Sequence, residues 1–216
     1  MKLEKQCEEL SIELKDINLC YSGKPELAVL KYFEEQGYIG TFTEGTMILN
    51  ILKALMLAKL AQYNTFDDRS DACARYLEAQ FTILKDKTSE LISSMRKTSK
   101  KDFLNNFREI SEHPFIKSEY PSLSVAVADA LFDAIHIDIF VKIAEKFAED
   151  PYLYRNGWPD LTIVKGTEVQ FIEVKTRDKL HESQLTTIPS MCALIPFPFS
   201  VVRVSKKAYN KNLQRT

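Results

Sequence analysis

The chain has 216 residues, of which 45% are hydrophobic and 27% are charged. These proportions exclude disordered, collagen-like and fibrous classes, and the length is sufficient for one large domain with a substantial core. With 29 basic and 30 acidic residues the formal net charge is −1, which by itself argues against a protein that binds a polyanion, because DNA-binding proteins usually carry a positive excess.

The sequence carries no visible targeting or membrane signal. Residues 1–16 lack the apolar stretch of a secretory leader. The best candidate for a membrane span, 46–61, is interrupted by Lys53 and Lys59 and is shorter than a span requires. The four cysteines are irregularly spaced, so we expect neither a zinc site nor a disulfide framework. A cytoplasmic protein without membrane contact is expected, and delivery into another cell as an effector is also compatible with these features.

The first stretch that predicts structure is 22–62, which we interpret as N-terminal core helices. Pro25 suits the first turn of a helix that ends at Gly37. A short extended segment follows at 38–43. Residues 44–61 then predict a long apolar helix that opens with Glu-Gly-Thr.

The second stretch, 65–150, predicts mostly amphipathic or buried helices with breaks at Pro114 and Pro121, and we interpret it as a helical insertion. The third stretch, 151–216, changes to strand periodicity, with Gly166 in the turn of a predicted hairpin. Its expected elements are a strand over 161–164, a strand over 169–175, a helix over 182–194 and a strand over 199–204. The whole chain, 1–216, is expected to form a single domain.

Three polar side chains lie on the predicted hairpin. Asp160 follows Pro159 at the start of the first strand, and Glu173 and Lys175 are two apart on the second strand, so they share one face. A tight hairpin can place Asp160 beside them. Two carboxylates with few other ligands suit Mg²⁺, and a neighbouring lysine can orient or help to deprotonate an attacking water. This combination is what metal-assisted phosphodiester hydrolysis requires.

The alternative is that Glu-x-Lys marks only a solvated strand face, which is its commonest meaning. The flanking segment 169–172 and Val174 are mostly apolar, however, so Glu173 and Lys175 emerge from a buried strand. Buried charges are costly unless they are paired or bound to metal. Trp158, the only tryptophan, precedes Asp160 by two residues, and we expect it to pack beneath the hairpin rather than to stack on a base.

The order Pro-Asp, hairpin, Glu-x-Lys resembles the signature of the PD-(D/E)xK nuclease superfamily. The longer pattern is similar to the VRR-NUC branch and covers 155–184: Gly157-Trp158-Pro159-Asp160-Leu161, then Phe171-Ile172-Glu173-Val174-Lys175, then Asp178, Leu180, Ser183 and Gln184. The resemblance implies an α/β, restriction-endonuclease-like core in which a small mixed sheet is flanked by helices and carries a large helical insertion.

The resemblance also implies roles for individual residues. Asp160, Glu173 and the backbone carbonyl of Val174 would bind a divalent metal, Mg²⁺ or Mn²⁺. Lys175 would be the catalytic lysine, and Gln184 would support the site or the scissile phosphate from the following helix.

The family uses one more glutamate, from an upstream helix. Glu44 is our choice as a catalytic residue and metal ligand, because Thr-Glu-Gly before a long apolar helix resembles the larger members related to the Fanconi-associated nuclease. Glu34 and Glu26 are the alternatives.

Basic residues are concentrated in two places. Residues 85–101 carry six basic and two acidic residues, and 205–216 carry four basic residues and no acid. Such runs usually form a solvated face or tail, but on a nuclease they are candidates for contacts with phosphates. The candidates for DNA binding are Arg96, Lys97, Lys100, Lys101, Lys206 and Lys207. The near-zero net charge therefore hides local basic patches beside metal-binding acids.

The sequence thus favours a metal-dependent DNA endonuclease. No zinc finger or arginine-rich recognition helix is apparent, so we expect selection by DNA structure, or little selection, rather than reading of a base sequence. Two alternatives stay open. One is an antibacterial DNase effector that pairs with an immunity protein, and the other is a non-catalytic nucleic-acid-binding or scaffold protein that keeps the nuclease fold.

Overall fold

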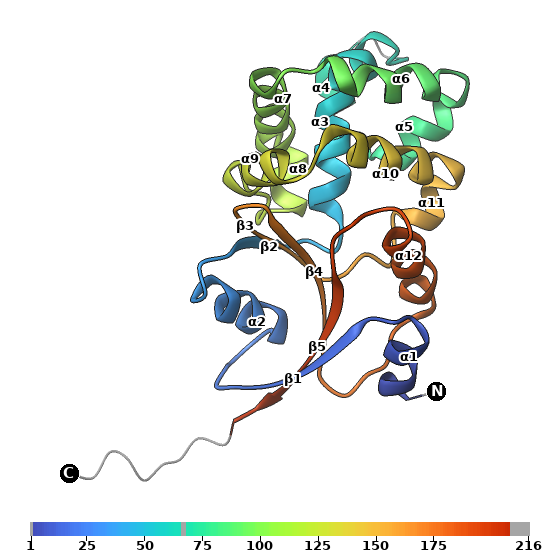
Figure 1. Cartoon of the computed structure of the whole chain (residues 1–216). Coiled ribbons are helices and arrows are strands. Elements are labelled where there is room, and N and C mark those ends of the chain that lie inside the picture. The colour runs from blue at the N-terminus through green and yellow to red at the C-terminus, as the bar shows by residue number, and fades with distance from the viewer. Residues whose placement is uncertain (1, 66–67, 208–216) are drawn as a thin grey trace, which may run out of the picture.

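A mixed five-stranded sheet forms the centre of the computed structural model, which describes residues 2–65 and 68–207 (Figure 1). Its strand order is β1-β5-β4-β3-β2. The strands are β1 (Glu13–Leu19), β2 (Ile39–Phe42), β3 (Leu161–Lys165), β4 (Glu168–Lys175) and β5 (Phe199–Lys206). β1, β5 and β4 run parallel, whereas β4, β3 and β2 pair antiparallel, so the hairpin lies within the sheet rather than at its edge.

Helices cover both faces of this sheet. They are α1 (Leu3–Glu9), α2 (Pro25–Glu34) and α12 (Glu182–Cys192). Figure 1 shows α2 on one side of the sheet and α1 and α12 on the other. Val29 and Phe33 of α2 bury one face of the sheet in a small cluster that includes Ile172 and Val202. The opposite face joins the main core, which continues into the remaining helices.

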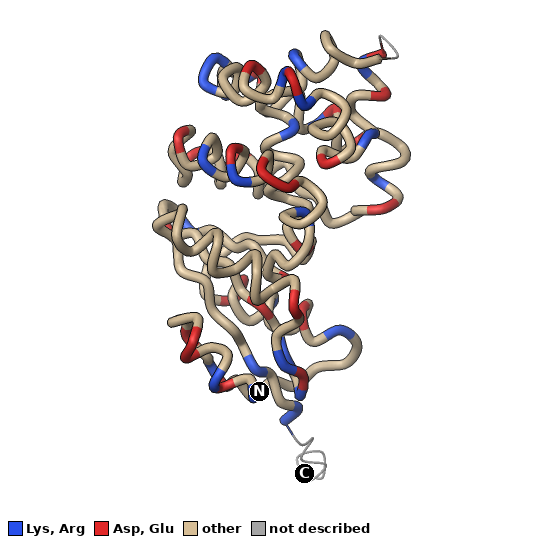
Figure 2. Tube along the Cα trace, turned by 90° about the vertical axis from the view of Figure 1, so that its right-hand side faces the viewer, with Lys and Arg blue, Asp and Glu red and all other residues tan. Residues whose placement is uncertain are grey.

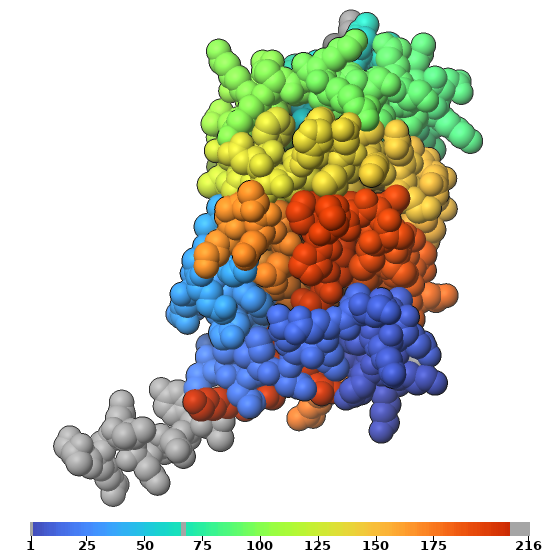
Figure 3. Space-filling view, viewed as in Figure 1, coloured from blue at the N-terminus to red at the C-terminus, as the bar shows by residue number. Residues whose placement is uncertain are grey.

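The remaining helices form a lobe beyond one end of the sheet (Figure 1). They are α3 (Thr46–Gln62), α4 (Arg69–Ala74), α5 (Leu77–Ile83), η1 (Lys85–Lys87), α6 (Thr88–Ser94), η2 (Met95–Lys97), α7 (Lys100–Glu112), α8 (Pro114–Glu119), α9 (Val125–Ala134), α10 (Ile137–Glu149) and α11 (Pro151–Tyr154). α3 is apolar nearly all round because it is the central helix of this lobe, and eleven of its residues are buried. In the space-filling view the lobe and the sheet region form one continuous surface (Figure 3).

The expected α/β class, with a mixed sheet, flanking helices and a large helical segment between the first core helices and the hairpin, is confirmed. The expected hairpin, the following helix and the last strand are present, and Gly166 occupies the turn with φ 58°. The sequence patterns did not predict α1 or β1. β1 is an edge strand that pairs with β5. No helix in the described part of the chain is long and apolar enough to cross a membrane.

Charged residues of both signs are mixed over the helical lobe (Figure 2). Several of them pair across helices. Arg96 lies 2.8 Å from Asp138, and Lys100 lies 2.7 Å from both Asp129 and Asp133. The face of the lobe drawn in Figure 2 therefore presents alternating charges rather than one basic surface.

Candidate active site

Strand register places the two central carboxylates beside each other. Leu161 of β3 pairs with Ile172 of β4, so the next residues outward, Asp160 and Glu173, lie opposite one another where β3 begins. Asp160 Oδ2 accepts a hydrogen bond from the Val174 N–H at 2.8 Å. Asp160 immediately precedes β3, so its side chain, rather than the β3 backbone, accepts the hydrogen bond from this N–H group of β4.

Glu173 and Lys175 form a buried ion pair on the same face of β4. Lys175 Nζ lies 2.6 Å from Glu173 Oε1, and the two side chains are only 8% and 2% exposed, respectively. The other carboxylate oxygen, Glu173 Oε2, is buried and has no hydrogen-bond partner among the described residues. An unpaired buried carboxylate oxygen is costly, so this strand end has capacity for one more positively charged or hydrogen-bonding group.

The carboxyl of Asp160 is strongly affected by this environment. Burial, and next the negative charge of Glu173, raise the pKa of Asp160 from 3.8 to about 8. The Val174 N–H and the Lys175 ammonium act in the opposite direction but do not cancel the shift. The cluster therefore holds two carboxylates with too little positive charge to stabilise both of them.

Glu44 lies just after the end of β2, and its backbone is next to that of Asp160. The backbone N–H groups of Thr43 and Glu44 approach the Asp160 carbonyl at 3.2 and 3.4 Å. Glu44 has φ 48°, and Gly45 follows with φ 86° as the residue that precedes α3. Positive φ is uncommon for a residue other than glycine. A side chain at position 45 would meet Trp158 at 2.4 Å, so Gly45 is required for the packing of this corner.

Trp158 is buried, and its Nε1 donates a hydrogen bond to the Tyr154 carbonyl at 2.9 Å. Its ring centre lies 6.0 Å from that of Phe171 in β4, so the expectation that it packs beneath the hairpin is confirmed.

Helix α12 brings Gln184 to the site. Gln184 is buried, and its Oε1 accepts a hydrogen bond from the His181 N–H at 3.0 Å, which caps the start of the helix. Because Oε1 is engaged in this way, Nε2 is the group of the Gln184 side chain that can donate a hydrogen bond into the site. The close approach of α12 depends on Gly157, whose φ is 76° and where a side chain would meet the Ser183 carbonyl oxygen at 2.1 Å.

These residues line one cavity of about 520 Å³, which we call the catalytic cavity. Asp160, Glu173, Val174, Lys175 and Gln184 all line it. Of the three upstream glutamates, Glu26 and Glu44 are among its lining residues and Glu34 is not. Glu26 also contributes to the raised pKa of Asp160, so its carboxylate is an electrostatic neighbour of the pair.

Arg155 and Asn156 line the same cavity and were not predicted as site residues. Their position immediately before the Gly-Trp-Pro-Asp segment is the signal in the sequence that could have indicated them.

The donor set fits a hard divalent cation with few protein ligands. Two side-chain carboxylates converge, one of their oxygens is unpaired, and Mg²⁺ is typically bound through one or two carboxylates while it keeps several waters. Within residues 2–65 and 68–207, no group of three or more His, Cys, Asp or Glu side chains lies close enough to hold a metal ion. Glu44 lies on the cavity wall with its side chain exposed, and its role as a ligand stays a prediction.

The predicted DNA-binding residues lie outside the catalytic cavity. Arg96 and Lys100 are engaged with carboxylates in the helical lobe, and Lys97 and Lys101 are exposed there. Lys206 is the last residue of β5 and Lys207 follows it, and Lys206 Nζ lies 5.0 Å from the centre of the Tyr21 ring. The basic residues beyond Lys207 are outside the described residues. Contact of this set with DNA stays a prediction.

No family model and no curated protein matches this sequence. Among solved structures, the fold is similar to that of paFAN1 bound to 5′ flap DNA with a gap. The complex with a two-nucleotide flap shows 21% identity and a TM-score of 0.61, and the complex with a one-nucleotide flap shows 22% and 0.62. In both comparisons the match covers 91% of this chain and 38% of the other, so this chain spans well under half the length of paFAN1. The likeness shows a shared fold.

Proposed function

We propose that this chain is a divalent-metal-dependent DNA endonuclease of the VRR-NUC type, which selects its substrate by DNA structure rather than by base sequence. The observation that carries the proposal is the buried Glu173–Lys175 pair opposite Asp160, with one carboxylate oxygen unpaired, in a cavity large enough to admit a phosphodiester. The fold similarity to paFAN1, which was solved with flap DNA, supports the same class of substrate.

Each residue of the cluster has a defined role in this proposal. Asp160, Glu173, the Val174 carbonyl and Glu44 would hold Mg²⁺ or Mn²⁺, which would supply Lewis-acid stabilisation of the negative charge on the phosphate. Lys175, fixed by its contact with Glu173, orients the attacking water and stabilises the charge that develops on the phosphate. Gln184 donates its Nε2 amide toward a phosphate oxygen, while its Oε1 stays bound to the His181 N–H.

Cleavage assays test the proposal. The purified chain is incubated with plasmid, 5′ flap, four-way junction, linear duplex and single-stranded DNA, in Mg²⁺, in Mn²⁺ and in EDTA. We expect cleavage that requires the metal and is fastest on branched DNA. Asp160→Ala and Lys175→Ala should each reduce the rate by roughly 100-fold or more.

The matched control is Glu34→Ala, which removes an exposed carboxylate from the same upstream region but outside the catalytic cavity. It should cleave like the wild type. If the wild type does not cleave, or if the Asp160 and Lys175 variants cleave equally well, the endonuclease proposal is wrong and a non-catalytic DNA-binding or scaffold role is favoured. Equal cleavage rates on all of these DNA forms would instead contradict the proposed selection by DNA structure.

A further inference from the structure

A second and larger cavity lies beside the catalytic cavity, and the proposed chemistry does not use it. Its volume is about 780 Å³, which is within the range of small-molecule sites. It is lined mainly by α3, by the start of α5 and by α8 with the segment that follows it, and we call it the lobe cavity. Glu44, Arg155 and Asn156 line both cavities, so a ligand in one is adjacent to a ligand in the other.

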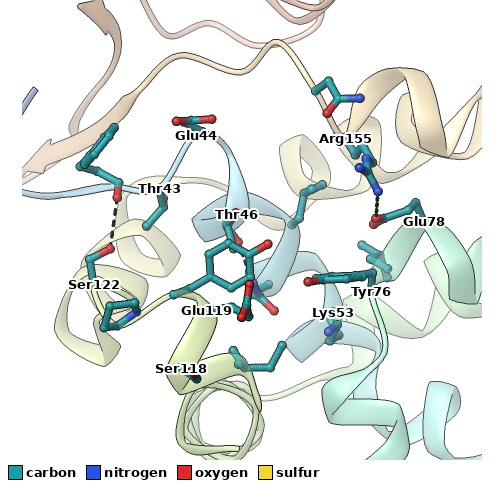
Figure 4. Close-up of a pocket in the computed structure, with 18 of the residues that line it drawn as sticks. Thr43, Glu44, Thr46, Lys53, Tyr76, Glu78, Ser118, Glu119, Ser122 and Arg155 are labelled. Atoms are coloured by element: carbon teal, nitrogen blue, oxygen red, sulfur yellow. Dashed lines mark hydrogen bonds and ion pairs between the residues drawn. The ribbon is translucent and has the colours of Figure 1, made fainter. Parts of the chain in front are cut away.

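The charges around the lobe cavity do not favour an anion. Three basic residues line it, but three acidic residues do so as well. Arg155 lies 2.7 Å from the buried Glu78, and Lys53 donates to the Cys73 carbonyl at 3.0 Å. Figure 4 shows the Glu78–Arg155 pair at one side of the cavity. A phosphate would therefore meet no unpaired cluster of cations here, whereas a neutral ligand would meet no excess charge.

The remaining lining groups are aromatic rings, hydroxyls, aliphatic side chains and the two amides of Asn50 and Asn156. The Tyr120 hydroxyl lies near those of Tyr76 and Thr46. Tyr76 reaches into the cavity from one side and Glu119 from the other (Figure 4). Asn50 is buried, and its Nδ2 donates to the Thr46 carbonyl at 2.9 Å, which leaves its Oδ1 to accept a hydrogen bond from a ligand. A planar, neutral group with hydrogen-bonding edges matches this lining, and a nucleobase is such a group.

We propose that the lobe cavity receives the base of one unpaired nucleotide of the DNA substrate, next to the phosphate bound in the catalytic cavity. This inference rests on the proposed endonuclease function. It also gives a physical reason for structure selectivity. A base in a flap, a gap or a frayed end can enter the cavity at little cost, whereas a paired base must first be unstacked and unpaired.

Fluorescent base analogues test the inference without any cleavage. 2-Aminopurine is placed at successive positions across the junction of a 5′ flap substrate, and its emission is measured on binding in EDTA. We expect a change confined to one unpaired position. Ser118→Trp should abolish that change and weaken binding on the order of tenfold, because Ser118 is an exposed residue of α8 that lines the cavity and a tryptophan there would obstruct part of it.

Lys117→Trp is the matched control, since it adds the same side chain at the neighbouring exposed position, which is not among the lining residues. It should behave like the wild type. Tyr76→Ala is a second variant that opens the cavity at a partly exposed position, and it should also remove the signal. The inference is overturned if emission changes equally at all positions, or if Ser118→Trp and Lys117→Trp behave alike.

An abasic site at the responding position separates this inference from the proposed function. In the wild type it should slow cleavage on the order of tenfold, and it should have no further effect in Ser118→Trp. If the wild type never cleaves but the 2-aminopurine signal depends on Ser118 as described, the endonuclease proposal fails while the base site stands. If cleavage occurs and the abasic site has no effect, the base site fails alone.

Discussion

Glu44 is held in a backbone conformation that few glutamates adopt, and it lies within the wall of the catalytic cavity. Among the described residues, only Ser11 and Glu44 combine positive φ with a side chain other than glycine. Such strain persists only where the surrounding contacts impose it, and it is concentrated at functional sites. Here the contacts are the Asp160 carbonyl and the packing of Gly45 against Trp158. This geometry supports Glu44 as the upstream acid.

Substitution of the three upstream glutamates by glutamine tests that assignment. We expect Glu44→Gln to lower the cleavage rate by roughly 10- to 100-fold, because the change removes a carboxylate charge from the cavity while keeping the side-chain shape. Glu26→Gln should have a smaller effect, and Glu34→Gln should have none, since that residue lies outside the cavity. Single-turnover rates with Mg²⁺ measure the difference. An impaired Glu34→Gln or an active Glu44→Gln would show that the assignment is wrong.

Lys53 is a buried cation of α3 that lines the lobe cavity, and it is only 2% exposed. Burial lowers the pKa of Lys53 from 10.5 to about 8, against the weaker opposing effects of Cys73 and Glu78. The folded state therefore releases this proton at lower pH than the unfolded state does. Between about pH 8 and pH 10.5 the unfolded chain binds more protons at this residue, so the contribution of Lys53 to stability rises with pH.

Lys53→Met should consequently stabilise the protein at pH 7, by at most on the order of 3 kcal/mol, because it removes the cost of a buried charge. The loss of the hydrogen bond to the Cys73 carbonyl reduces this gain. The difference between variant and wild type should shrink as pH rises from 8 to 10. Denaturant unfolding at several pH values measures it, with the exposed Lys101→Met as control. A difference that does not change with pH would contradict the shifted pKa.

At the scale of elements, Gly45 and Gly157 determine how α3 and α12, respectively, pack beside the hairpin. Gly157→Ala should destabilise the protein by more than about 2 kcal/mol, because the added methyl would collide with the backbone of Ser183 and displace the start of α12. Gly166→Ala is the matched control. It has φ 58° with nothing within 4 Å, so it should cost only about 1 kcal/mol of backbone strain. Thermal unfolding compares them, and equal losses would contradict the close packing of α12.

The hairpin, α12 and β5 were predictable because each has a local signal: alternation of side chains, glycine in a turn, or prolines before a strand. The same alternation placed Glu173 and Lys175 on one face, and strand register then set Asp160 opposite Glu173. α1 and β1 were not predictable in this way. β1 is an edge strand with no buried residue, and it pairs with β5 almost two hundred residues later. Local patterns carry little information about such a pairing.

α1 is fixed by a similarly distant contact. The Gln6 side chain accepts from the Leu180 N–H at 2.9 Å and donates to the Leu180 carbonyl at 3.2 Å, which supports the loop between β4 and α12. The lobe cavity was not predictable either, because its lining comes from α3, from separate helices of the insertion and from the segments around Glu44 and Arg155.

For the whole molecule, the helical lobe and the sheet have separable roles. The sheet positions the acids and Lys175 at the edge of the hairpin, while the lobe, through α3, forms the wall on the other side of Glu44. The charge of the whole chain is nearly balanced, and cross-helix ion pairs engage Arg96 and Lys100 of the lobe. We therefore expect recognition to depend on the shape of the DNA and on the two adjacent cavities more than on a broad basic surface.

The measurement that tests the central claim most directly is the single-turnover cleavage rate of an end-labelled 5′ flap substrate as a function of Mg²⁺ concentration, for the wild type and for Glu173→Gln. The wild-type rate should rise with Mg²⁺ to a plateau and fall to background in EDTA. Glu173→Gln should be slower by roughly 100-fold or more at every concentration. Cleavage that persists in EDTA, or a Glu173→Gln rate equal to that of the wild type, would contradict a metal-dependent nuclease site at Asp160, Glu173 and Lys175.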